Sequence, residues 1–65
     1  MKIGILKKWN ELQGWGFIEC EDDGEDYFFH ASNARKGLKI SEGMQLKFDA
    51  QIGQKGDEAK NVSHI

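Results

Sequence analysis

The chain has 65 residues, with nine basic and eleven acidic side chains and a net charge of −2. This length predicts one domain over residues 1–65, with a small core that buries only about 60% of the unfolded surface. The single cysteine, Cys20, excludes an intramolecular disulfide, and the sequence lacks the ligand spacing of a zinc site and any apolar run of roughly 20 residues. A free thiol and no export signal indicate a cytoplasmic chain without membrane contact.

Three strands are predicted in the first half of the chain. They run from about Lys2 to Trp9, from Trp15 to Glu21 and from Tyr27 to Ala31. Residues 32–43 have no sustained apolar period and contain two glycines, so we expect a long connection with one helical turn near Ser32.

The fourth strand has the clearest alternation of apolar and polar residues. Its expected inward-facing residues are Met44, Leu46, Phe48, Ala50 and Ile52. Residues 53–56 predict a turn, and residues 59–64 predict a short last strand with Val62 inward. Three strands, a long crossing and a final hairpin predict an all-β fold, a small five-stranded antiparallel Greek-key barrel of the OB type.

Two strands carry a pattern of rings that a core does not require. Trp15 and Phe17 alternate with glycines, so both rings project to one face of the second strand. If the third strand folds back on the second, Phe28 and His30 join that face. Aromatic alternation can also mark a core alone.

The residues that alternate with these rings indicate that the rings are exposed. Ile18, Tyr27 and Phe29 are sufficient to fill the inner face of a small sheet. Exposed clusters of large rings usually mark an interaction surface, and glycines in a strand mark places of close approach. We therefore expect unpaired bases to stack on this face.

The charges are distributed unevenly. Six of the eleven acids lie within residues 19–26, where there is no lysine or arginine, and the remaining residues carry nine basic and five acidic side chains. The acidic run lacks the spacing of a calcium loop, so we interpret it as a solvated turn and expect no metal. Elsewhere, lysines are expected to attract phosphates, and they are Lys2, Lys7, Lys8, Lys39 and Lys55.

Two motifs and their flanks resemble a known family. Residues 13–18 (QGWGFI) and 27–32 (YFFHAS) resemble the Lys-Gly-Phe-Gly-Phe-Ile and Val-Phe-Val-His-Phe-Ser motifs of bacterial cold-shock domains. Residues 7–10 (KKWN) are similar to that family's Lys-Trp-Phe-Asn, and residues 56–62 resemble its closing strand. The resemblance covers nearly the whole chain. It implies a cold-shock barrel that binds single-stranded RNA or DNA and loosens weak base pairing without a cofactor.

The chain differs from the family motifs at several contact positions. Lys8 stands where the family has a stacking Trp, Ala31 where it has Phe, Gln13 where it has Lys, and Leu38 where it has a loop Phe. The resemblance then implies a micromolar, strongly salt-dependent binder with low sequence preference. The expected nucleic-acid-binding residues are Lys7, Lys8, Trp9, Asn10, Gln13, Trp15, Phe17, Phe28, His30, Lys39 and Lys55.

Other functions remain open at this point. A barrel with a reduced aromatic surface and an acidic hairpin could be a protein-interaction module, and the domain could belong to a longer chain. An enzyme is not expected, because the sequence has no catalytic triad order, paired carboxylates or phosphate loop. We expect a monomer, with a strand-swapped dimer as the alternative.

Overall fold

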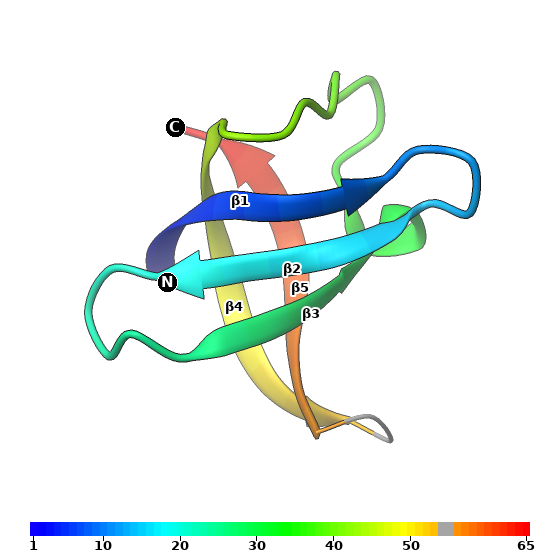
Figure 1. The fold of residues 1–65 in the computed structure, drawn as a ribbon. Coiled ribbons are helices and arrows are strands. Elements are labelled where there is room, and N and C mark those ends of the chain that lie inside the picture. Colours follow the sequence, from blue (N-terminus) through cyan, green and yellow to red (C-terminus); the bar gives the residue numbers. More distant parts are fainter. Residues whose placement is uncertain (54–55) are drawn as a thin grey trace.

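Five strands and one helical turn form a closed barrel. The computed structural model describes residues 1–53 and 56–65. The elements are β1 (Lys2–Asn10), β2 (Trp15–Cys20), β3 (Asp26–His30), the 3₁₀ turn η1 (Ala31–Asn33), β4 (Gln45–Gly53) and β5 (Gly56–His64). β1, β2 and β3 form one curved layer, and β4 and β5 cross behind it (Figure 1). The predicted barrel and the helical turn near Ser32 are confirmed, whereas Gln54 and Lys55 of the predicted turn lie outside the described residues.

The strand order around the barrel is β1-β2-β3-β5-β4. Its neighbouring strands are antiparallel except at the seam between β3 and β5, which run parallel. In the described part of the chain, one pair in register, Phe28 and Glu58, joins these two strands. A parallel bridge between Ala34 and Val62 continues the contact beyond η1. Within the same residues, no helix is long and apolar enough to cross a membrane.

The core lies between the two layers. Its buried apolar side chains are Leu6, Ile18, Cys20, Tyr27, Phe29, Leu46, Phe48, Ala59 and Val62. The rings of Tyr27 and Phe48 lie 5.2 Å apart and join the layers. Burial of such side chains is the main favourable term for a domain this small. The inward orientation predicted for Ile18, Tyr27, Phe29 and Val62 is therefore confirmed.

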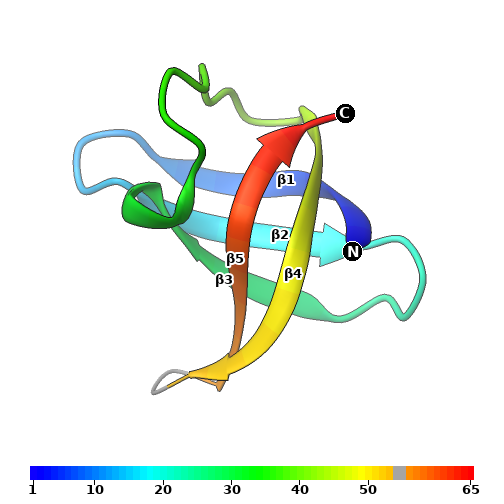
Figure 2. The same ribbon diagram turned by 180° about the vertical axis from the view of Figure 1, so that it is seen from behind.

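The second half of β4 corrects the expected inward set. Leu46 and Phe48 are buried and Met44 is half-buried, but Ala50 is exposed and Ile52 is 84% exposed. β1 pairs with β4 only as far as Phe48, so the later residues of β4 have no strand beside them on that side. β3 meets β5 at Glu58, opposite Gln51, and only the end of the β4–β5 pair, where Ile52 pairs with Asp57, extends beyond the strands on both sides (Figure 2).

The acidic turn between β2 and β3 is held by one aspartate. Asp23 accepts hydrogen bonds from the Glu25 N–H (2.9 Å) and from the Tyr27 hydroxyl (2.8 Å). These two bonds, the backbone one first, lower the pKa of Asp23 to about 2. The same bond to Asp23 raises the pKa of Tyr27 to about 12. The turn therefore has a fixed geometry that starts at the edge of the core.

Candidate nucleic-acid interface

A bulge in β1 decides which of its side chains join the rings of β2 and β3. Leu6 pairs with Ile18 and Lys8 pairs with Phe17, so Lys7 is an extra residue in β1. Such a bulge changes the parity of every following residue. Lys8 therefore projects on the same outer face as Phe17.

Two rows of paired residues build this outer face. One row contains Lys8, Phe17 and Phe28, which are opposite one another on β1, β2 and β3. The next row contains Asn10, Trp15 and His30. Residues that are directly opposite in a sheet share a face and lie close enough for their side chains to interact. The strands therefore bring together six of the expected binding residues.

The rings form one continuous cluster, which we call the aromatic face: Trp15, Phe17, Phe28 and His30. The ring centroid of Trp15 lies 6.0 Å from that of Phe17, in an edge-on contact, and 6.4 Å from that of Phe28, in a stacked contact. The centroids of Phe17 and Phe28 lie 5.9 Å apart. The three rings are half-buried and His30 is exposed. These four residues line an open hollow of about 420 Å³. The ring edges support one another, and one side of the cluster stays open to a ligand.

Trp15 is positioned by the turn that precedes β2. Its indole Nε1–H donates to Gln13 Oε1 at 3.0 Å, and the Gln13 N–H donates to Asn10 Oδ1 at 3.1 Å. Gly14, which has a φ of 72°, permits this tight turn. Asn10 and Gln13 therefore use their side-chain oxygens to position the ring, and their amide NH₂ groups are left as donors for other contacts.

His30 is held in place by η1. Its Nδ1 accepts the Ser32 N–H at 3.1 Å and lies 2.9 Å from the Ser32 hydroxyl. A neutral imidazole that accepts at Nδ1 carries its proton on Nε2. His30 therefore presents a donor to the solvent side of the aromatic face.

Trp9, one of the expected binding residues, does not project on the aromatic face. It pairs with Gly16 on the inner face, and its ring stacks on Phe29 with the centroids 5.3 Å apart. Gly16 makes the room, because a Cβ there would clash with the Lys8 carbonyl oxygen and lie 3.0 Å from the Trp9 ring. The bulge at Lys7 is the cause of the inward orientation. Trp9 is half-buried and extends the core to the edge of the interface.

The two lysines of β1 have different electrostatic surroundings. Lys8 is exposed and forms no ion pair with the described residues, whereas Lys7 pairs with Asp26 at 2.8 Å. The hydrogen bond to Asp26 raises the pKa of Lys7. Glu19 and Asp26 pair across β2 and β3 just beyond Phe17 and Phe28. The positive charge on this face is therefore concentrated at Lys8, and one end of the face is acidic.

Two other lysines that were expected to attract phosphates, Lys2 and Lys39, are also described by the structure. Lys2 contacts Asp23 at 3.6 Å, and Lys39 is exposed on the connection between η1 and β4. Leu38, on the same connection, packs against the core. Lys55 lies outside the described residues.

Sequence reasoning missed two acidic residues near the interface. Glu58 of β5 lies in register with Phe28, and the Glu42 carboxylate accepts the Trp9 N–H at 3.0 Å. Both come from segments far along the chain, and no local pattern predicts such contacts. Among the residues that the structure describes, no three His, Cys, Asp or Glu side chains form a metal-binding group.

Comparisons with known proteins agree with this architecture. Residues 2–65 match the family model described as 'Cold-shock' DNA-binding domain. The chain is 44% identical to "Cold shock-like protein CspC" of Shigella flexneri over 64 residues, which cover 95% of this chain and 93% of that protein. It is 38% identical to "Cold shock protein ScoF" of Streptomyces coelicolor, over 97% of each chain. A solved structure, "drosophila Unr CSD456", shares the fold with a TM-score of 0.80 at 22% identity, over 98% of this chain and 26% of that one.

Proposed function

The chain belongs to the 'Cold-shock' DNA-binding domain family, and from this membership we propose that it binds single-stranded RNA or DNA on the aromatic face. The observation that carries the proposal is the cluster of Trp15, Phe17 and Phe28, with centroids 5.9–6.4 Å apart on one outer face. One barrel carries the complete cluster, so we propose that a monomer binds.

Stacking explains a preference for unpaired bases. A base within a duplex has both of its π-faces covered by neighbours, and it cannot reach Trp15, Phe17 or Phe28 without leaving the stack. Binding therefore shifts a weak hairpin toward its melted form by the difference in affinity between the two forms. This activity, similar to that of an RNA chaperone, needs neither a nucleotide cofactor nor a catalytic residue.

The contacts of the aromatic face support moderate affinity and low sequence preference. Stacking is worth about 1–3 kcal/mol per base and tolerates every base. Three rings and one unpaired lysine, Lys8, are consistent with a dissociation constant near 1 μM, or about −8 kcal/mol. Ala31 and Leu38 supply no ring, and Leu38 is turned toward the core.

Tryptophan fluorescence tests the proposal directly. We would titrate the protein with a short oligo-dT strand at low and at moderate salt, with a duplex of the same length as the control. Stacking on Trp15 predicts quenching that saturates, weakens with salt and is absent with the duplex. Equal quenching by the duplex would contradict selection of unpaired bases.

Absence of quenching at low salt would favour the other candidate, a protein-interaction module. Glu19, Asp26 and Glu58 beside the rings are the observation in its favour, because they repel phosphates. A pull-down that depends on Phe17 and Phe28 would then identify the partner surface.

A further inference from the structure

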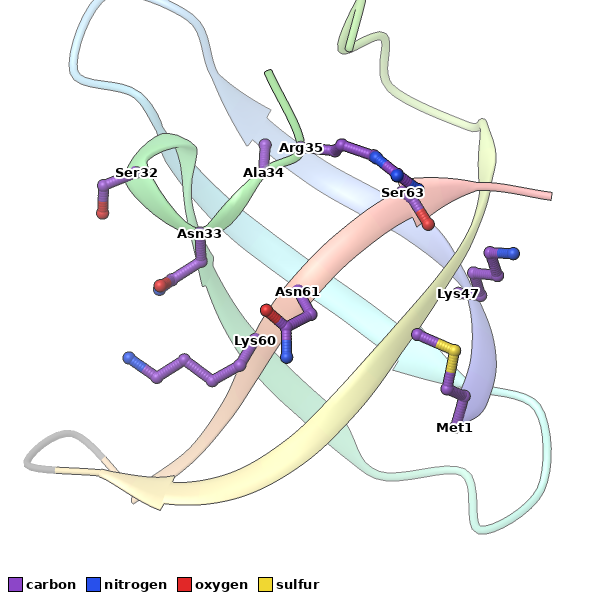
Figure 3. A pocket seen from close by; sticks show the side chains of 9 residues that line it. All are labelled: Met1, Ser32, Asn33, Ala34, Arg35, Lys47, Lys60, Asn61 and Ser63. Carbon is purple, nitrogen blue, oxygen red and sulfur yellow. The ribbon is translucent and has the colours of Figure 1, made fainter. Parts of the chain in front are cut away.

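A basic groove lies on the other side of the barrel from the aromatic face. Two adjoining hollows, of about 520 and 330 Å³, share Arg35, Lys47 and Ser63. Figure 3 shows the larger one, which is lined by side chains from η1, from Lys47 of β4 and from Lys60, Asn61 and Ser63 of β5. We call the combined feature the basic groove.

The charged side chains described in the lining of the basic groove all have the same sign of charge. Its cationic side chains are Arg35, Lys36, Lys47 and Lys60, and no carboxylate side chain is among the described lining residues. Lys60 pairs with Glu58 at 3.3 Å, whereas Arg35, Lys36 and Lys47 form no ion pair with the described residues. The nearby Asp49 accepts the Asn61 amide at 2.9 Å. Three cations thus remain unpaired beside hydroxyl and amide groups.

The backbone holds these groups in fixed positions. The Arg35 N–H donates to the Val62 carbonyl at 2.7 Å, and Ala34 bridges to Val62. Asn61 has a φ of 52° at a bulge in β5, where two residues stand opposite Phe48. The bulge lets Ala59 and Val62, three residues apart, both face the core, and Ser63 then lies on the side of the groove, where it is nearly buried. The groove is therefore part of the barrel wall.

The basic groove continues from one end of the aromatic face. β3 ends at His30, and Ser32 and Asn33, two and three residues later, line the groove. The opposite end of the face carries Glu19 and Asp26. Figures 1 and 2 place η1 and the acidic turn at opposite ends of the β2–β3 pair. A polyanion on the face meets acids in one direction and unpaired cations in the other.

We propose that the basic groove binds the phosphate backbone of the same single strand whose bases stack on the aromatic face, after the strand has passed η1. This inference rests on the proposed function and extends it. Guanidinium and ammonium groups suit phosphate oxygens, and the serine and asparagine side chains add hydrogen bonds. The described lining residues include no phenylalanine, tyrosine or tryptophan, and their one ring is the imidazole of His64, so the groove holds phosphates and offers no stacking cluster to the bases.

The test compares two strand lengths in three variants. OB folds occupy roughly 4–16 nucleotides, so a dT4 strand is expected to cover the aromatic face and a dT12 strand to reach the groove. R35Q/K47Q removes two groove charges, F17A/F28A removes two rings, and R35K/K47R is the matched control that keeps both charges. Each is titrated at several salt concentrations by fluorescence quenching or anisotropy, after its melting temperature has been measured.

The expected result is a loss that depends on length. R35Q/K47Q weakens dT12 binding about tenfold at low salt and lowers its salt slope by about 1.4, at about 0.7 for each phosphate contact of a single strand. Its affinity for dT4 stays unchanged, and R35K/K47R binds both lengths like the wild type. The extra binding registers of a longer strand affect all variants equally.

Other results would overturn the proposal or its premise. Unchanged dT12 binding by R35Q/K47Q, or an equal loss for both lengths, would remove the groove from the path of the strand. Unchanged binding of both lengths by F17A/F28A, or no binding of either length by the wild type, would overturn the proposed function instead.

Discussion

The aromatic face and the basic groove lie on opposite sides of one barrel and carry different contacts. On the face, three rings lie within 6.4 Å of one another, with Lys8 as the unpaired cation and Glu19 and Asp26 at one end. In the groove, Arg35 and Lys47 are unpaired, and no phenylalanine, tyrosine or tryptophan is among the described lining residues. Base selection and phosphate attraction can thus be changed separately in this molecule.

Removal of rings has the largest expected effect on affinity. The double variant F17A/F28A is expected to lose about 2–6 kcal/mol of binding, or roughly 30-fold or more, at about 1–3 kcal/mol per stacked base. Both rings project outward, so the melting temperature is expected to fall by only a few degrees. Ile52→Ala, which truncates an apolar side chain that is 84% exposed outside both surfaces, is the control. A large fall in melting temperature would place these rings in the core.

Substitution of the two tryptophans separates stability from binding, because Trp9 faces the core and Trp15 lies on the aromatic face. Trp9→Ala is expected to destabilise the fold by about 2–3 kcal/mol, somewhat less than the 3–5 kcal/mol of a fully buried ring, because Trp9 stacks on Phe29. Trp15→Ala is expected to lower affinity with little loss of stability. Urea unfolding and oligo-dT binding of both variants measure the contrast, and the opposite assignment of effects would contradict the effect of the β1 bulge.

Lys8 separates charge from stacking on the aromatic face. Lys8→Glu is expected to weaken binding severalfold and lower the salt slope by about 0.7 or more, whereas Lys7→Ala has a smaller effect because Asp26 already pairs with Lys7. Lys8→Trp is expected to bind about tenfold more tightly with a lower salt slope, through one added ring opposite Phe17. Fluorescence anisotropy with a labelled strand measures all three. A salt slope unchanged by Lys8→Glu would remove Lys8 from the interface.

The smallest effect is expected in the acidic turn, away from the groove. The pKa of Asp23 is lowered to about 2 from its ordinary 3.8, so its carboxylate stabilises the fold above pH 4, and this contribution is lost as the pH falls through 2. Asp23→Asn is expected to lower the melting temperature at pH 7, and the difference from the wild type is expected to shrink between pH 4 and pH 2. A difference that is constant with pH would show that the charge of Asp23 is not involved.

The aromatic face was predictable because it depends on local parity. Strand residues alternate between faces, so Trp15 and Phe17 had to share one side, and the partner strand followed from the short turn after β2. Alternation also identified the core residues Leu46 and Phe48. These features depend on residues that are close together in the chain, and sequence reasoning is most successful there.

The failures come from irregular and long-range features. The bulge at Lys7 reverses the parity of Trp9, and nothing in the local sequence marks it. Ile52 has the correct parity for the core but lies beyond the last residue of β4 that β1 covers. Arg35, Lys47 and Lys60 look like ordinary surface charges until β4, β5 and η1 bring them to one groove.

The short pairing between β3 and β5 implies that a bound nucleic acid also stabilises the barrel. Phe28, one of the proposed stacking rings, also belongs to the pair that joins these strands in register. Short joints of this kind open locally, and their amide protons then exchange with solvent. A nucleic-acid strand that spans Phe28 and η1 binds the form in which β3 and β5 are paired. By mass action it lowers the population of the locally open form. The bound nucleic acid would then hold β3 and β5 together, and amide exchange around Phe28 and Glu58 would be slower in the complex than in the free protein.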